Sequence, residues 1–232
     1  ATPLGVAAAL SLPDSWRSDF LRICDGIGEA VRWAGTRIVG GDLTRGSALS
    51  LTVTVLGHAA TPMSRRGARN GDALWVTGRL GGPLLALRAW ERGTTPRDEH
   101  RARFAHPVAR FDEARWLAEH GATAGMDVSD GVVAEASHLA AAGRVRIVLD
   151  LDRLPVVAGA TVDDAARSGE EYELVVTAPA DLDAEAFERR FGIPLTRIGA
   201  VEEQAPGVAA LETRRGGARV TPPRGHDHLP AS

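Results

Sequence analysis

The sequence predicts a two-layer α/β fold divided into two domains. Segments rich in β-branched residues alternate with amphipathic segments of helical spacing along most of the chain. With 232 residues, of which 44% are apolar and 25% charged, the chain is long enough for one large or two small globular domains. Residues 57–70 (GHAATPMSRRGARN) lack periodicity and contain glycine, proline and arginine. We therefore place the domain boundary there and expect domains at 1–62 and 63–232.

The first domain is expected to contain one long helix and two strands. In residues 12–35 (LPDSWRSDFLRICDGIGEAVRWAG), Asp14 or Ser15 can cap the helix and Gly35 can end it. The apolar residues at helical spacing are Trp16, Phe20, Ile23, Ile27 and Val31. Residues 36–40 (TRIVG) and 48–56 (ALSLTVTVL) are predicted strands, joined by a loop at 41–47 (GDLTRGS).

The second domain is expected to alternate strands with helices, which indicates layers of sheet and helix. Predicted strands lie at 72–78, 122–128, 144–151, 172–178 and 195–201. Predicted helices lie at 82–93, 107–121, 131–143 and 182–192, and a further short helical segment precedes residue 172. Residues 223–232 are expected to form a tail.

The composition excludes several functional classes. A formal net charge of −3, spread along the chain, gives no electrostatic basis for binding nucleic acid or an anionic membrane. The apolar runs are too short to cross a bilayer, and no basic leader precedes one. Cys24 is the only cysteine, so no intramolecular disulfide can form and a cytoplasmic location is expected. All 27 basic residues are arginine, which excludes a P-loop lysine and Schiff-base chemistry.

Residues 127–131 (DVSDG) place two aspartates and a serine between a predicted strand and a predicted helix. One interpretation is helix capping, because serine and aspartate commonly accept hydrogen bonds from the first N–H groups of a helix. However, Asp127, Ser129 and Asp130 together exceed what one cap requires. The other interpretation is a metal-bridged phosphate. In that case the helix start favours the anionic oxygens, and the aspartates bind Mg²⁺ that shares those oxygens.

Residues 40–46 (GGDLTRG) also have two interpretations. From this segment alone we favour a hairpin connection that uses glycine, aspartate and threonine as turn formers. The functional alternative is that Gly40 and Gly41 allow a phosphate to approach the backbone closely, while Asp42 binds the metal of that phosphate.

Residues 168–176 (SGEEYELVV) place glutamates around Tyr172 at the entrance to a predicted strand. Glu171 is expected to belong to a solvated acidic loop. Glu173 interrupts an apolar strand, so it should either face solvent or have a partner. Residues 225–230 (GHDHLP) contain two histidines near the end of the chain, with no cysteine nearby. They are a weak signal for zinc.

Taken in order, these motifs resemble those of the thiamine-monophosphate kinase family. The series is GGDLTRG, SRRGARNGDALWVTG, DVSDGV, SGEEYELVVTAP and GHDHL, and the resemblance covers nearly the whole chain. This family belongs to a superfamily that includes aminoimidazole ribonucleotide synthetase, selenophosphate synthetase and the hydrogenase maturation factor HypE. The DVSDG element followed by GEEYEL discriminates best between these relatives.

The resemblance implies Mg²⁺-dependent transfer of phosphate from ATP to thiamine monophosphate, which yields thiamine diphosphate. It implies a homodimer and no nucleic-acid or membrane partner. Matched residue by residue, it implies these roles: metal binding and catalysis for Asp42, Asp127 and Asp130; nucleotide binding for Gly41, Asp42, Arg65 and Ser129; substrate binding for Glu170 and His226.

The sequence departs from the family pattern in three places. Leu43 stands where threonine is common, and His226 replaces a larger aromatic residue. In addition, the chain begins at what resembles the middle of the first domain, so residues 1–62 are expected to be the remainder of an ATP- and metal-binding domain. Two alternatives to an active kinase therefore remain. One is a catalytically silent relative that binds nucleotide or thiamine phosphates, and the other is a sister-family ATP-dependent synthetase.

Overall fold

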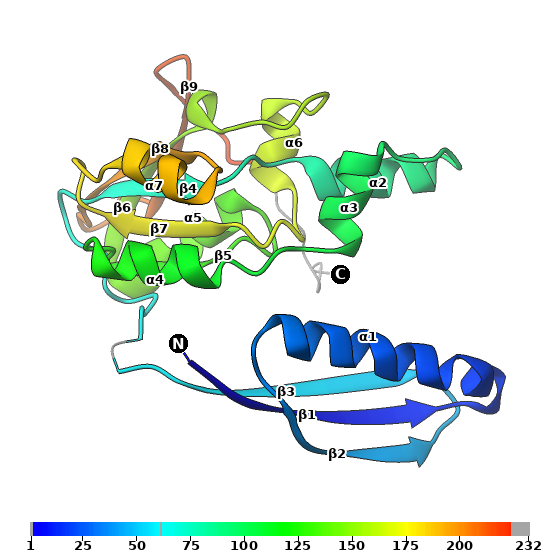
Figure 1. Cartoon of the computed structure of the whole chain (residues 1–232). Helices are drawn as coiled ribbons and strands as arrows, with labels where there is room; N and C mark the ends of the chain where they lie inside the picture. The colour runs from blue at the N-terminus through cyan, green and yellow to red at the C-terminus, as the bar shows by residue number, and fades with distance from the viewer. Residues whose placement is uncertain (1, 61, 224–232) are drawn as a thin grey trace. The chain divides into compact units, whose positions relative to one another are not determined.

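The computed structural model describes residues 2–60 and 62–223, which belong to two compact units, Ala1–Pro62 and Met63–Ser232. The first unit contains β1 (Thr2–Leu12), η1 (Asp14–Asp19), α1 (Phe20–Trp33), β2 (Ile38–Arg45) and β3 (Ser50–His58). The strand order is β2-β1-β3, with β1 parallel to β2 and antiparallel to β3. The helix α1 lies along one face of this sheet (Figure 1).

This topology corrects two predictions for the first unit. The strands β2 and β3 each pair with β1 and not with each other, so residues 40–46 are not a hairpin connection. Instead, β2 continues through this segment to Arg45, which places Asp42 on a strand opposite Ala9. The strand β1 was not predicted, because its alanine-rich sequence has low β-propensity.

The predicted helix at 12–35 begins as the 3₁₀ helix η1 and continues as α1. Neither Asp14 nor Ser15 caps it, because Pro13 and Asp19 occupy the N-cap positions and neither makes a side-chain capping bond. The predicted end is confirmed. The helix α1 stops at Trp33, and Gly35 follows with a φ of 64°, a left-handed conformation that suits glycine after a helix.

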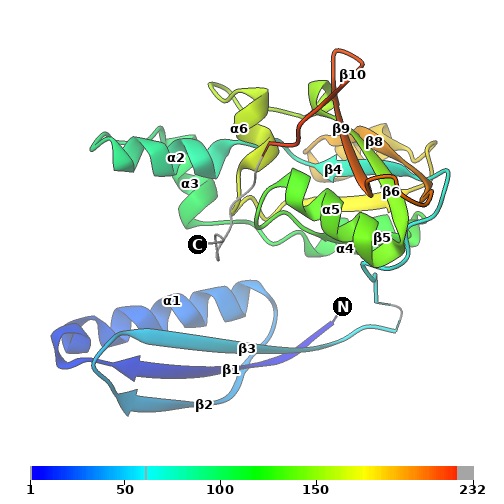
Figure 2. The same ribbon diagram turned by 180° about the vertical axis from the view of Figure 1, so that it is seen from behind.

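The second unit is a mixed seven-stranded sheet with helices, seen from both sides in Figures 1 and 2. Its strands are β4 (Ala73–Thr77), β5 (Ala124–Asp127), β6 (Val145–Asp150), β7 (Leu174–Ala178), β8 (Leu195–Glu203), β9 (Leu211–Arg215) and β10 (Ala218–Val220). Its helices are α2 (Gly82–Glu91), α3 (Asp98–Ala105), α4 (Phe111–Glu119), α5 (Val132–Gly143), η2 (Leu151–Arg153), α6 (Val162–Arg167) and α7 (Ala184–Phe191). The strand order is β10-β9-β6-β8-β4-β7-β5, and only β6 and β9 pair in parallel.

Two apolar clusters lie on opposite faces of this sheet. Leu74 and Val76 of β4 belong to a cluster with α5, whereas Ala73 and Trp75 belong to a cluster with α4 and α7. Successive side chains of a strand point to opposite faces, so helices cover both faces of the sheet. The predicted α/β class with two sheet-and-helix domains is confirmed.

Four elements of the second unit were not predicted, namely α3, η2, β9 and β10. The sequence of α3 (DEHRARFA) is charged and has no apolar stripe, and that of β9 (LETRR) is mostly polar. Their hydrophobic periodicity is therefore too weak to indicate structure. No helix in the described ranges is both long and apolar enough to span a membrane. Almost all of the predicted tail lies outside the described residues.

Candidate functional site

The DVSDG turn lies at the end of β5, directly before α5. Asp127 is the last residue of β5 and is exposed, whereas Val128 is fully buried and anchors the turn. Ser129 and Asp130 are half-buried. Gly131 is the N-cap of α5, with a φ of 109°, and a Cβ on it would lie 3.0 Å from the backbone of Arg167. The turn therefore presents Asp127, Ser129 and Asp130 next to Gly131, a position where the backbone conformation and the nearby Arg167 backbone favour glycine.

The N–H groups of this turn are bound by Glu135, a fully buried residue of α5. Its Oε1 accepts hydrogen bonds from the N–H groups of Ser129 (3.2 Å) and Asp130 (2.9 Å). No side-chain capping bond is made at the N-cap position of α5. Glu135 therefore fastens the turn to α5, whose N-cap residue, Gly131, has no side chain with which to cap the helix.

The segment Ser168–Glu173 docks against the DVSDG turn through backbone hydrogen bonds. The N–H of Glu170 donates to the Ser129 carbonyl (2.8 Å), and the N–H of Tyr172 donates to the Val128 carbonyl (3.0 Å). In return, the Val128 N–H donates to the Glu173 carbonyl (2.8 Å). These bonds extend the pairing of β5 with β7. They bring four predicted site residues together: Asp127, Ser129, Asp130 and Glu170.

Glu170 and Tyr172 adopt left-handed backbone conformations, with φ values of 57° and 50°. Such conformations cost on the order of 1–3 kcal/mol each for residues other than glycine, and they persist only where the surroundings impose them. The Tyr172 hydroxyl donates to Glu170 Oε2 (2.9 Å). This hydrogen bond, together with burial and the charges of Glu170, Asp127 and Asp130, raises the pKa of Tyr172. The segment is therefore strained and electronegative beside the aspartates.

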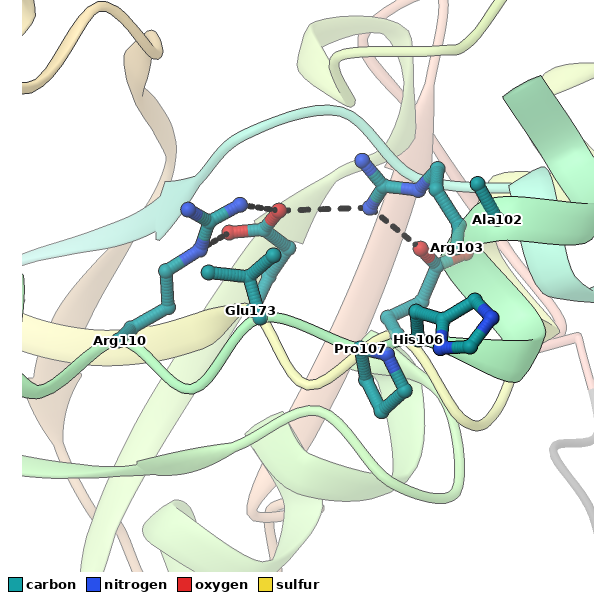
Figure 3. Close-up of a pocket in the computed structure, with 8 residues that line it drawn as sticks. Ala102, Arg103, His106, Pro107, Arg110 and Glu173 are labelled. Carbon is teal, nitrogen blue, oxygen red and sulfur yellow. Dashed lines mark hydrogen bonds and ion pairs between the residues drawn. The ribbon is translucent and has the colours of Figure 1, made fainter. Parts of the chain in front are cut away.

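The carboxylates of Glu171 and Glu173 point away from this surface into the protein, where their side chains are 0% and 1% exposed. Arg110 binds Glu173 with both arms of its guanidinium, Nε to Oε2 (3.0 Å) and Nη2 to Oε1 (2.7 Å). Arg103 Nη2 contacts both carboxylates, at 2.9 Å for Glu171 and 3.3 Å for Glu173 (Figure 3). Thr77 also donates to Glu173 Oε2 (2.7 Å).

The prediction that Glu171 lies in a solvated acidic loop is wrong. Burial raises the pKa of its carboxyl, although the charge of Arg103 acts in the opposite direction. For Glu173, the second alternative is correct, because it has partners. The sequence pattern indicates neither Arg103 nor Arg110 as a partner. The signal available for such partners was the charged Glu173 in an apolar strand, which requires a cation nearby without indicating which arginine provides it.

A pocket of about 330 Å³ opens beside Asp127 and Tyr172. Its lining is mostly apolar and comprises Pro107, Ala109, Arg110, Phe111, Ala114, Asp127, Tyr172 and Leu174. A smaller pocket of about 150 Å³ lies over the buried carboxylates and includes Arg103, Arg110, Glu171 and Glu173 in its lining (Figure 3). Asp127 therefore stands at the edge of a concave site with an apolar wall.

The other predicted site residues are placed as follows. Arg65 is exposed, and its neighbour Ser64 accepts a hydrogen bond from the N–H of Gly125 in β5 (3.3 Å). The segment that carries Arg65 therefore lies along the strand that ends in Asp127. Asp42 is exposed and lines a pocket of about 380 Å³ within the first unit. His226 lies outside the described residues.

Gly41 has a structural role within the first unit. A Cβ at this position would lie 2.0 Å from the carbonyl oxygen of Ala8 on β1, so only glycine fits the paired strands. This close approach explains the residue type without a phosphate. A nucleotide contact by Gly41 stays a prediction.

Within residues 2–60 and 62–223, no group of three or more His, Cys, Asp or Glu side chains is arranged to hold a metal ion. The carboxylates of Asp127 and Asp130 nevertheless suit Mg²⁺. This ion prefers oxygen donors and often takes only one or two protein carboxylates, with substrate phosphates and water as its remaining ligands.

Comparison with known proteins identifies the family. Residues 1–59 match the model of the AIR synthase related protein N-terminal domain, and residues 69–211 match that of the C-terminal domain. A thiamine-monophosphate kinase of Halobacterium salinarum is 33% identical over 214 residues, which cover 90% of this chain and 73% of that protein. The chain belongs to the thiamine-monophosphate kinase family.

Solved structures of this family have the same fold. The crystal structure of thiamine-monophosphate kinase from Stenotrophomonas maltophilia K279a is 32% identical, with a TM-score of 0.83 over 95% of this chain and 74% of that chain. A structure of AaThiL complexed with AMPPCP and TMP is 27% identical, with a TM-score of 0.80 over 98% of this chain and 74% of that chain.

The chain is shorter than several of its relatives. The thiamine-monophosphate kinase of Pyrococcus horikoshii is 32% identical over 87% of this chain, but the matched part is 65% of that protein's length. For the kinases of Methanopyrus kandleri and Pyrococcus abyssi the matched shares are 63% and 60%.

Proposed function

We propose that this protein transfers the γ-phosphate of ATP to thiamine monophosphate and releases ADP and thiamine diphosphate. The observation that carries the proposal is the docking of the Glu170–Tyr172 segment onto the DVSDG turn, which gathers acidic side chains beside an apolar pocket. A relative with 27% identity has been solved with AMPPCP and TMP bound, which supports the same pair of ligands here.

The chemistry of this transfer suits the side chains of the site. An oxygen of the acceptor phosphate bonds to the γ-phosphorus as the bond from that phosphorus to the ADP oxygen breaks. The acceptor phosphate is already ionised at neutral pH, so no catalytic base is needed. The main obstacle is repulsion between two polyanions, which metal ions and arginines relieve. With no lysine in the chain, arginine is its only strongly basic side chain.

We assign the residues to roles on this basis. Asp127 and Asp130 of the second unit would hold Mg²⁺, which when bound neutralises phosphate charge. Asp42 of the first unit is assigned a metal-binding role as well. Ser129, Gly41 and Arg65 are assigned to the nucleotide.

Thiamine monophosphate is assigned to Glu170 and His226, with its rings in the apolar pocket of about 330 Å³. Phe111 is the aromatic side chain of this lining besides Tyr172 and is 54% exposed.

An activity assay tests the proposal. The protein is incubated with ATP, Mg²⁺ and thiamine monophosphate, and thiamine diphosphate is measured by chromatography. We expect product that depends on all three. Product from selenide or from an aminoimidazole precursor in place of thiamine monophosphate would favour a sister-family synthetase. Calorimetric binding of ATP and thiamine monophosphate without product would favour the catalytically silent alternative.

We further propose that the protein is a cytoplasmic homodimer that associates through the sheet of the first unit. Exposed apolar side chains on β2 and β3 support this, including Ile38 (53%), Val53 (47%) and Val55 (67%). Unpaired strand edges and apolar faces favour association. We expect light scattering to give the mass of a dimer, and a monomer over a wide concentration range would contradict this.

A further inference from the structure

Two alternating sets of side chains leave the segment Glu170–Glu173 in opposite directions. Glu170 is exposed and Tyr172 half-buried, and both lie on the side of the DVSDG turn. Glu171 and Glu173 are buried on the other side, against Arg103 and Thr77. Because the two sets alternate along one backbone, contacts that hold Glu171 and Glu173 also influence the direction of Glu170 and Tyr172.

The buried pair is held from outside its own segment. Arg103 belongs to the last turn of α3, and Arg110 directly precedes α4. Their side chains are 26% and 14% exposed, so these contacts are only weakly screened by solvent. Arg110 makes two parallel hydrogen bonds to Glu173, a geometry that fixes orientation as well as distance.

The wall behind the buried carboxylates is also closely fitted. Gly78, with a φ of 63°, leaves room for Glu173, because a Cβ there would lie 2.2 Å from Oε1. The N–H of Gly81 donates to Glu171. Neither carboxylate can turn outward without losing several partners at once. The left-handed backbone of Glu170 and Tyr172 is therefore held from both sides, by these contacts of the buried carboxylates and by the hydrogen bonds to the DVSDG turn.

We propose that Arg103 and Arg110 are positioning residues, which hold Glu171 and Glu173 and thereby fix Glu170 and Tyr172 toward the substrate. The identity of the substrate rests on the proposed function. The positioning of Glu170 and Tyr172 by the two arginines does not depend on it. Arg103 is the more informative of the two arginines. It lines the pocket over the buried carboxylates, whereas the pocket beside Asp127 is lined by Arg110 and not by Arg103. We therefore expect an effect of Arg103 on substrate binding to act through the carboxylates that it holds.

The test uses Tyr172, which is the only tyrosine in the chain. Protein labelled with meta-fluorotyrosine should give one fluorine resonance that reports on this side chain. In Arg103→Gln we expect that resonance to shift or broaden. We expect the KM for thiamine monophosphate to rise roughly tenfold, as is typical when a supporting partner of a site is removed, with the KM for ATP close to its original value.

Arg146→Gln is the matched control. Arg146 is 19% exposed and pairs with Glu202 and Glu212, but it lies on β6 and contacts β8 and β9 instead of the segment. It should leave the Tyr172 resonance and both KM values unchanged. An unchanged resonance in Arg103→Gln, or equal changes in both variants, would overturn the inference. So would a changed resonance in an active Arg103→Gln enzyme whose KM for thiamine monophosphate is normal.

Two further measurements test the inference if Arg103→Gln does not fold or if the unmodified protein is inactive. If Arg103→Gln does not fold, Arg110→Lys replaces it, because it keeps the charge and loses the two-armed contact. We expect the same change at Tyr172, and the original resonance would overturn the inference. If the unmodified protein transfers no phosphate, the proposed function fails, while the fluorine resonance still decides whether the arginines position the segment.

Discussion

Replacing Asp127 or Asp130 with asparagine is expected to lower phosphate transfer by roughly 100-fold or more, which corresponds to about 3 kcal/mol of lost transition-state stabilisation. Asparagine keeps the size of the side chain but removes the charge with which a carboxylate binds Mg²⁺. The fold should be preserved, because asparagine accepts hydrogen bonds at a helix start about as well as aspartate, and because the N–H groups of Ser129 and Asp130 are bound by Glu135. Steady-state kinetics and thermal unfolding of each variant measure the two effects.

Asp150→Asn serves as the control for this experiment. Asp150 also ends a strand, β6, and its side chain accepts a hydrogen bond from the N–H of Asp152 at the start of η2. Asparagine caps about as well as aspartate, so both activity and stability should be preserved. If Asp127→Asn and Asp130→Asn were as active as this control, the metal-binding role of the DVSDG turn would be refuted.

The second large effect is expected from Glu173→Ala, which should lower the free energy of unfolding by about 3–5 kcal/mol. The substitution removes the two-armed partner of the mostly buried Arg110, which keeps only its longer contact with Glu113 (3.3 Å), and it removes the acceptor of the Thr77 hydroxyl. Removing one partner from a buried network of charges is far more costly than losing a surface ion pair. Chemical denaturation, followed by tryptophan fluorescence, measures the change.

Glu185→Ala is the corresponding surface control. Glu185 is 89% exposed and forms an ion pair with Arg189 within α7, so its removal should cost no more than about 1 kcal/mol. A loss in Glu173→Ala as small as in this control would mean that the arginines are satisfied without the carboxylate. The buried cluster would then contribute little to stability.

Local patterns predicted those elements whose apolar residues repeat regularly. The helix α5 and the strands β4, β6 and β7 were predicted within a few residues, because they contribute directly to the buried clusters. The strand β1 and the helix α3 were missed, because an alanine-rich strand and a charged helix carry little periodicity. The hairpin proposed at 40–46 was wrong because pairing with β1 is a long-range contact that the segment itself does not encode.

The acidic residues of the candidate site could be predicted from the sequence, but the residues that bind and orient them could not. Charge crowding singled out Asp127 and Asp130, and the interruption of an apolar strand singled out Glu173. The partners Arg103, Arg110 and Glu135 were not found, because each becomes a partner only when the sheet order and helix positions are known. Among many arginines on the chain, nothing local distinguishes the two that contact Glu173.

The docking of Ser168–Glu173 on the DVSDG turn also bears on how the site behaves over time. Irregular loops usually open readily and must be ordered when a ligand arrives, at an entropic cost to affinity. Here the amide hydrogens of Glu170, Glu171 and Tyr172 are bonded to the carbonyls of Ser129 and Val128, as in the ladder of the adjoining sheet. This segment therefore has the rigidity of a strand, although its shape is that of a loop. A ligand that reaches Glu170 meets a surface that was already ordered when the domain folded.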